Sequence, residues 1–135
     1  MIKTFFLTIL LISTTAGLLI SQNNSLAQSI KRGKEVYTGY CMSCHMSQGE
    51  GLQAVYPPLA KSDYLLKDPK RVIGIILDGQ RGEITVNGQK YNVEMPAQNY
   101  LTDEQIADVI NYSTNNWGNK SKVVITPAQV KAGRK

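Results

Sequence analysis

Histidine and cysteine are scarce in this sequence, whose 135 residues include one His and two Cys. All three lie in the pentapeptide Cys41–His45, so a zinc site built only from Cys and His cannot be completed elsewhere in the chain. The single His also removes the usual acid–base residue, and we find no Ser–His–Asp set, carboxylate pair or phosphate-binding loop. These absences argue against an enzyme that acts on a substrate.

Long apolar runs are missing after residue 20. The one such run, Phe5–Ile20, follows Lys3, and its length of about 16 residues is short of the roughly 20 that a membrane-spanning helix needs. Small residues then occur at Ser25 and Ala27, in the pattern that a signal peptidase reads. We therefore expect a signal peptide over residues 1–27, cleaved after Ala27, rather than an uncleaved anchor. The mature chain is expected to be periplasmic or otherwise exported, without a stable membrane span.

Charge of either sign is not concentrated in one region. The formal net charge is +5, but Lys and Arg are scattered apart from the ends of the mature chain, and no stripe of basic and aromatic residues indicates nucleic-acid binding. The apolar fraction of 42% and the charged fraction of 19% are ordinary for a globular protein, and the length allows one domain. A domain of this size gains stability from a buried apolar ligand.

The pentapeptide Cys41–His45 has four interpretations in an exported chain, where cysteines meet an oxidising environment. A Cys41–Cys44 disulfide leaves His45 without a role, a thioredoxin-like redox pair lacks its βαβ context, and zinc lacks further ligands. Haem attachment explains all three residues, because two thiols bond the vinyl groups while His45 binds the iron from the same side. We therefore predict one covalently attached haem c.

A haem iron in an electron carrier needs a second axial ligand, and one His excludes two-His coordination within this chain. Met is the usual alternative. Met1 leaves with the signal peptide, while Met42 and Met46 flank the motif and cannot reach round the ring. Met95 remains, and Pro96 stiffens its loop. The alternative is that Met95 fills the core while the sixth position is open or held by Lys.

With these residues the chain resembles the class I cytochromes c over about residues 31–118. Further matches are Gly33, Tyr37, Gly49, Gly51, Tyr56–Leu59, Leu101–Glu104, Tyr112 and Trp117. The resemblance implies a mostly α-helical domain over residues 28–118, with three main helices around one haem. It also implies that a proline carbonyl, here that of Pro57, accepts a hydrogen bond from His45 and fixes its ring.

Local sequence patterns agree with this fold class. Three helices are expected: about 30–40 with Ser29 as its cap, one opened by Asp68-Pro69 and stopped at Gly79, and one opened by a capping box of Thr102 and Gln105. Asn87-Gly88 within an alternating segment predicts a small β-hairpin near residues 83–93. The hairpin resembles one in bacterial cytochrome modules that occur alone or attached to nitrite reductases, oxidases and dehydrogenases.

Other residues are candidates for a place beside the haem, although each could equally be ordinary core or surface. The candidates for lining it are Tyr56, Tyr64, Leu65, Leu66, Val72, Ile76, Tyr91 and Leu101. Arg71 or Arg81 could pair with a haem propionate, since the guanidinium fork matches a carboxylate. Residues 119–135 are expected to form a basic, solvated C-terminal tail, in which Thr126-Pro127 could open a short helix.

Together these features predict an exported one-electron carrier that shuttles electrons between respiratory or periplasmic redox proteins, and that is not an enzyme. A dedicated cytochrome subunit of a reductase, oxidase or dehydrogenase is the alternative, and it involves the same chemistry with a permanent partner. A haem enzyme or ligand binder with an open sixth position requires that Met95 does not bind the iron.

Overall fold

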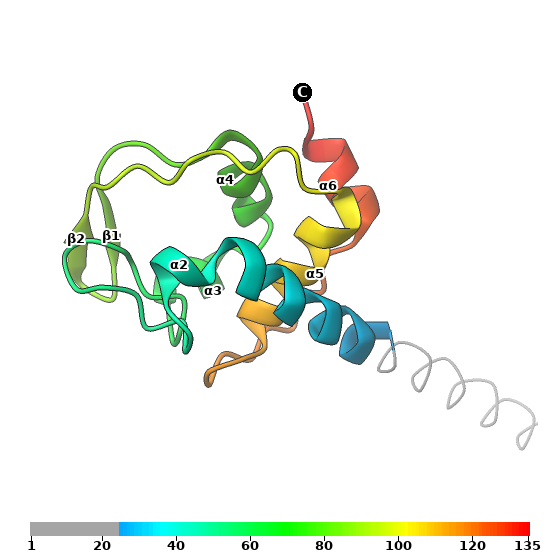
Figure 1. Cartoon of the computed structure of the whole chain (residues 1–135), viewed down its shortest axis with the longest axis horizontal. Coiled ribbons are helices and arrows are strands. Elements are labelled where there is room, and N and C mark those ends of the chain that lie inside the picture. Colours follow the sequence, from blue (N-terminus) through cyan, green and yellow to red (C-terminus); the bar gives the residue numbers. More distant parts are fainter. Residues whose placement is uncertain (1–24) are drawn as a thin grey trace, which may run out of the picture.

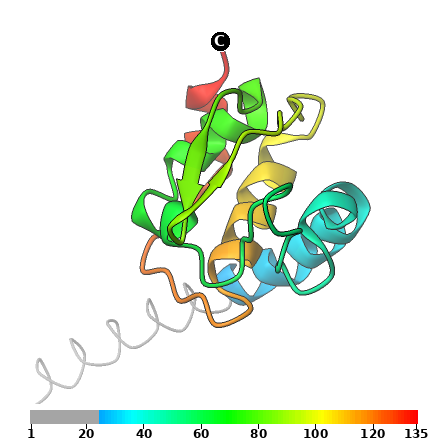
Figure 2. The ribbon, with the colours of Figure 1, turned by 90° about the vertical axis from the view of Figure 1, so that its left-hand side faces the viewer.

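The computed structural model describes residues 25–135 and is mostly helical, as the sequence predicts (Figure 1). A helix over 25–40 comes first. The elements that follow it are α2 (Met42–His45), α3 (Asp63–Lys67), α4 (Arg71–Asp78), β1 (Ile84–Val86), β2 (Gln89–Tyr91), α5 (Asp103–Thr114) and α6 (Pro127–Gly133). The N-terminal helix packs on one side of α5, while α4 and α6 pack on the other (Figure 2). No helix within residues 25–135 is long and apolar enough to cross a membrane.

The N-terminal helix is already formed at residue 25, so the prediction that Ser29 caps it is wrong. Ser29 instead lies inside the helix, and its buried hydroxyl donates a 2.6 Å hydrogen bond to Oδ1 of Asp108 in α5. A polar side chain inside a helix is tolerated here because a neighbouring helix supplies its partner. Nearly all of the predicted signal peptide, residues 1–27, lies outside the described residues.

The N-terminal helix crosses α5 at Gly33. A Cβ atom at this position would lie 2.0 Å from the carbonyl oxygen of Asp108 and 2.7 Å from the Cβ of Tyr112, so only glycine permits the approach. Beside the crossing, the Asp108 side chain is 4% exposed and accepts hydrogen bonds from Nε and Nη2 of Arg32, at 2.6 and 2.9 Å. This bidentate pairing, mainly through its hydrogen bond, raises the pKa of Arg32 and neutralises a buried carboxylate.

An aromatic cluster extends from the crossing toward the pentapeptide Cys41–His45. The ring of Tyr37 lies 5.5 Å from that of Tyr112 and 4.9 Å from that of Trp117, measured between centroids. The hydroxyl of Tyr37 donates a 2.7 Å hydrogen bond to the carbonyl of Met46, just past the pentapeptide. The cluster therefore fixes the end of the chain segment that carries the two cysteines.

After the N-terminal helix, the boundaries of the predicted helices follow the sequence signals with one shift. The capping box of Thr102 and Gln105 is present at the start of α5, as predicted. However, α4 begins at Arg71 rather than at Asp68-Pro69, because a turn precedes it in which Oδ1 of Asp68 accepts from the Arg71 N–H. The helix ends before Gly79, as predicted.

The predicted hairpin is confirmed in its position and in its turn. Strands β1 and β2 pair in antiparallel register, with Val86 opposite Gln89, and Asn87 and Gly88 form the two-residue turn with φ of 50° and 79°. Positive φ at both positions is the geometry that an Asn-Gly hairpin adopts. Asp63 at the start of α3 exchanges two hydrogen bonds with Asn87 and so holds the hairpin against the rest of the domain.

The prediction of a solvated tail over residues 119–135 is wrong, because α6 packs against α4 and α5. Val130 is 0% exposed and Ile125 is 2% exposed. The side chain of Asn111 in α5 bonds both backbone groups of Ile125, each at 2.8 Å. The buried residues are separated by polar ones along the chain, so their burial becomes visible only in the packed structure.

Two glycines of the N-terminal helix provide a matched test of the crossing. Gly33→Ala should lower the free energy of unfolding by roughly 2 kcal/mol or more, since overpacking a close contact forces the helices apart. Gly39→Ala should be neutral or stabilising by up to about 1 kcal/mol, because no atom lies within 4 Å of its Cβ position and alanine favours helix. Denaturant unfolding of both variants measures the change in the free energy of unfolding. Equal changes would contradict the close contact at Gly33.

Candidate haem site

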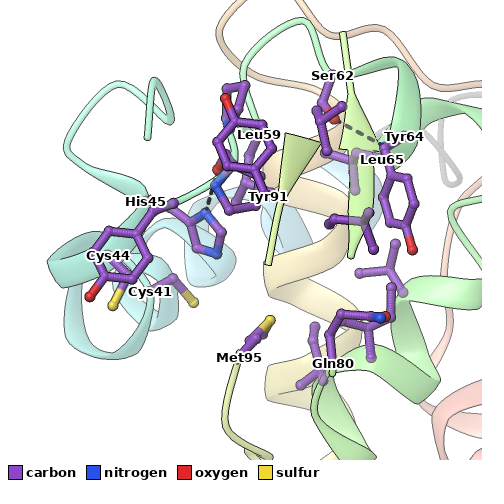
Figure 3. A pocket seen from close by; sticks show the side chains of 18 of the residues that line it. Cys41, Cys44, His45, Leu59, Ser62, Tyr64, Leu65, Gln80, Tyr91 and Met95 are labelled. Atoms are coloured by element: carbon purple, nitrogen blue, oxygen red, sulfur yellow. Dashed lines mark hydrogen bonds between the residues drawn. The ribbon is translucent and has the colours of Figure 1, made fainter. Parts of the chain in front are cut away.

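The pentapeptide Cys41–His45 forms one helical turn at the end of the N-terminal helix. The backbone N–H of Cys41 donates to the carbonyl of Tyr37, and that of His45 to the carbonyl of Cys41, at 2.9 and 3.0 Å. Residues three and four apart share a face of a helix. Cys41, Cys44 and His45 therefore line the same cavity (Figure 3).

Both cysteines are free thiols in the structure. Burial, with a smaller contribution from Cys44, raises the pKa of Cys41 to about 11. A thiol with a raised pKa is a poor nucleophile at neutral pH, because the thiolate is the reactive form. This does not resemble the lowered cysteine pKa of thioredoxin-like redox pairs.

His45 is held by one hydrogen bond. Its Nδ1 lies 2.9 Å from the carbonyl oxygen of Pro57, the residue that the family resemblance indicates. A carbonyl only accepts, so Nδ1 carries the hydrogen and Nε2 keeps its lone pair free. Burial lowers the pKa of His45, and the bond to Pro57 partly offsets this, so the neutral imidazole that binds metals is favoured.

The cavity wall is mostly apolar, and its residues come from between Cys41 and Ser113, with none from residues 25–40 or from α6. Of the sequence candidates, Leu66 and Leu101 do not line it, and Leu101 belongs instead to the buried core. The candidates that do line it are Tyr56, Tyr64, Leu65, Val72, Ile76 and Tyr91. Sequence reasoning missed several residues whose place depends on helix packing or on strand register, namely Ser62, Ile84, Val86, Val109, Ile110 and Ser113.

Met95 enters the cavity from a separate segment, after the hairpin (Figure 3). Its backbone N–H and carbonyl exchange two hydrogen bonds with Gln80, at 3.0 and 2.9 Å. Gly79 has φ of 80° and ψ of 178°, and a Cβ there would lie 2.7 Å from the Met95 carbonyl oxygen. The end of α4 therefore positions Met95, a contact that no sequence pattern reveals.

The two candidate arginines lie outside the cavity wall. Arg81 pairs with Glu94 at 2.9 Å, and both side chains are exposed. Arg71 donates a hydrogen bond to the carbonyl of Tyr64, and its guanidinium lies 3.9 Å from the centroid of the Tyr64 ring. The buried Nε of Arg71 has no acceptor within residues 25–135. An N–H of this kind is one that a bound carboxylate could satisfy.

Comparison with known families explains this arrangement. The cytochrome c family model matches residues 30–117. The chain belongs to the cytochrome c family. The match covers most of the domain predicted over 28–118 and ends before α6. Cytochromes c are electron-transfer proteins rather than enzymes, and they carry covalently attached haem c.

Relatives of two kinds are similar to the chain. Cytochrome c-552 of Thermus thermophilus is 36% identical over 114 residues, which cover 82% of this chain and 75% of the relative. The cytochrome c subunit of a quinone alcohol dehydrogenase from Gluconobacter oxydans is 32% identical over 100 residues, covering 73% and 21%. The gluconate 2-dehydrogenase cytochrome c subunit of Pantoea cypripedii is 32% identical over 125 residues, covering 85% and 28%.

The residues around the cavity fit a haem c. Two thiols and an imidazole lie on one helical turn, a thioether comes from another segment, and most of the remaining wall is apolar. Within the described residues, no group of three or more His, Cys, Asp or Glu side chains could hold a metal ion by itself, as a zinc site would require. This combination of donors fits a haem, whose porphyrin already holds the iron.

A glycine pair tests how Met95 is positioned. Gly79→Ala should weaken or abolish the far-red absorption band that sulfur-to-iron bonding gives ferric cytochromes, because the new methyl group displaces the Met95 backbone. Gly88→Ala also carries the strain of a positive φ, of 79°, but no atom lies within 4 Å of its Cβ position and Gly88 does not line the cavity, so the band should persist. Equal loss in both variants would indicate strain rather than the contact with Met95.

Proposed function

We propose that this chain is an exported one-electron carrier with a haem c attached through Cys41 and Cys44, and with His45 and Met95 as the two axial ligands. The observation that carries the proposal is that these four side chains, from two separate segments, line the same mostly apolar cavity. When bound, the haem supplies an iron that changes between ferric and ferrous by one electron.

The helical turn supports attachment at Cys41 and Cys44. Their spacing of three residues places both sulfur atoms on the face that carries His45, so both thioether bonds and the nitrogen ligand come from the same side. The hydrogen bond from His45 to Pro57 leaves Nε2 as the free ligand atom and orients the ring. Pro57 is thus proposed to contribute to cofactor binding without touching the iron.

Ligation by Met95 leaves no coordination position for a substrate. A thioether ligand raises the reduction potential, and two axial ligands supplied by the protein keep the coordination similar in both oxidation states. Of the two candidate arginines, Arg71 is the better partner for a propionate. It is partly buried and its Nε lacks an acceptor within residues 25–135, whereas Arg81 is exposed and paired with Glu94.

Export is supported by Lys3, the apolar run Phe5–Ile20 and the small residues at Ser25 and Ala27. Cleavage after Ala27 would also retain Ser29, so the hydrogen bond between Ser29 and Asp108 would survive in the mature chain. We place the mature protein in the periplasm or an equivalent exported compartment, where cysteines and haem meet during maturation.

The partners are proposed to be redox proteins, as the two kinds of relative suggest. The similarity covers 75% of the Thermus cytochrome c-552 but only 21% and 28% of the two dehydrogenase subunits. This difference favours a free carrier that meets its donor and acceptor in turn. A permanent subunit of a dehydrogenase is the alternative.

Met95→Ala tests the ligation. It should abolish the far-red band, lower the reduction potential and let the reduced protein bind carbon monoxide, since a thioether ligand raises the potential and blocks the sixth position. Met42→Ala is the matched control, because Met42 is exposed within the attachment motif and should leave all three properties unchanged. An unchanged potential in Met95→Ala would remove Met95 from the ligand set.

Purification from the native membrane and soluble fractions distinguishes carrier from subunit. The haem-containing protein should elute as a monomer and should exchange electrons with a separately purified redox protein. Stoichiometric co-purification with a dehydrogenase would instead support the subunit.

Extraction tests the covalent attachment. Haem should stay on the chain after denaturation and acid–solvent extraction, because thioether bonds survive both.

A further inference from the structure

The segment that joins Met95 to α5 contains neither helix nor strand. Its first half is fastened to α4, because Met95 exchanges two backbone hydrogen bonds with Gln80, and the N–H of Gln98 donates to the carbonyl of Ile76 at 2.7 Å. Beyond Gln98 the segment bonds to α4 no further. Its second half is held by the burial of Leu101, which is 3% exposed, and by one further polar anchor.

That anchor is Arg134, near the end of the chain. Its Nη1 donates to the carbonyl of Asn99 at 2.8 Å, its Nη2 donates to the carbonyl of Leu101 at 2.6 Å, and its Nε donates to Oδ1 of Asp103 at 2.6 Å. One planar guanidinium thus holds two carbonyls of the segment and the first residue of α5. Arginine suits this role because its donors form a rigid fork.

Arg134 is itself held in place by the packing of α6. Val130 is fully buried, and the backbone at Gly133 approaches Ile73 so closely that a Cβ would lie 3.0 Å from its methyl group. The side chains of Arg134 and Asp103 are only 30% and 29% exposed. Partial burial makes these charge-assisted hydrogen bonds stronger than those of a surface pair.

We propose that Arg134 is a positioning residue for Met95. It fixes the far end of the segment 96–102, whose first residue, Pro96, lines the cavity, and would thereby help to keep the Met95 sulfur in place at the proposed iron, although it touches neither. The inference rests on the proposed ligation by Met95. It gives α6, which lies outside the part of the chain that the cytochrome c family model matches, a role in the redox site.

Imidazole is a suitable probe, because it competes with Met95 for ferric iron and its binding removes the far-red band. Arg134→Ala should bind imidazole at least about tenfold more tightly than the unchanged protein, since loss of several hydrogen bonds favours the open segment. Arg134→Lys keeps the charge but not the fork, so it should show much of the same increase. If Arg134→Ala does not fold, the imidazole affinity of Arg134→Lys tests the proposal.

Two controls separate this role from charge and from general instability. Lys135→Ala removes the neighbouring charge, which pairs with Asp78 on α4 and not with the segment, and its imidazole affinity should stay within about twofold of the unchanged value. Ser29→Ala should lower the free energy of unfolding, because it breaks the bond to Asp108, without altering imidazole affinity.

The outcomes separate this inference from the proposed function. If the unchanged protein lacks the far-red band, ligation by Met95 fails and the role of Arg134 fails with it. If the band is present but both Arg134 variants bind imidazole as the unchanged protein does, only the role of Arg134 is overturned. A rise in affinity as large in Ser29→Ala as in Arg134→Ala would also overturn it.

Discussion

The close approach of two helices at Gly33 is the constraint on which the rest of the domain depends. The N-terminal helix carries the pentapeptide Cys41–His45 at its end, and α5 supplies part of the cavity wall. The distance between the helices therefore sets how far Cys41, Cys44 and His45 lie from that wall. Arg32 and Ser29 satisfy the buried carboxylate of Asp108, so the crossing leaves no unpaired charge in the interior.

A second constraint acts on the other side of the cavity. Met95 lies on a long connection, and a connection of that kind is mobile unless its backbone groups find partners. The end of α4 provides them near Met95, and the end of α6 provides them farther on. The hairpin adds the apolar side chains of Ile84, Val86 and Tyr91 to the cavity wall.

Features encoded by neighbouring residues could be predicted from the sequence. The spacing of Cys41 and Cys44, the capping box at Thr102 and the Asn-Gly turn each depend on residues a few positions apart, and the structure contains the capping box and the turn. Features that depend on distant contacts could not. Ser29 looked like a helix cap because Asp108 is far away in sequence, and residues 119–135 looked solvated because the surface that buries Val130 belongs to other helices.

The hydrogen bond between His45 and Pro57 helps to make the side of the cavity that carries His45 more firmly held than the side that carries Met95. The His45 face is part of a continuous helical segment, and the two proposed thioether bonds would fasten it further. The opposite face is a loop held at separate points by hydrogen bonds and by the burial of Leu101. With the proposed haem bound, the Met95 side would therefore give way before the side that carries Cys41, Cys44 and His45. The fold thus builds one firmly held side and one less firmly held side into the same cavity.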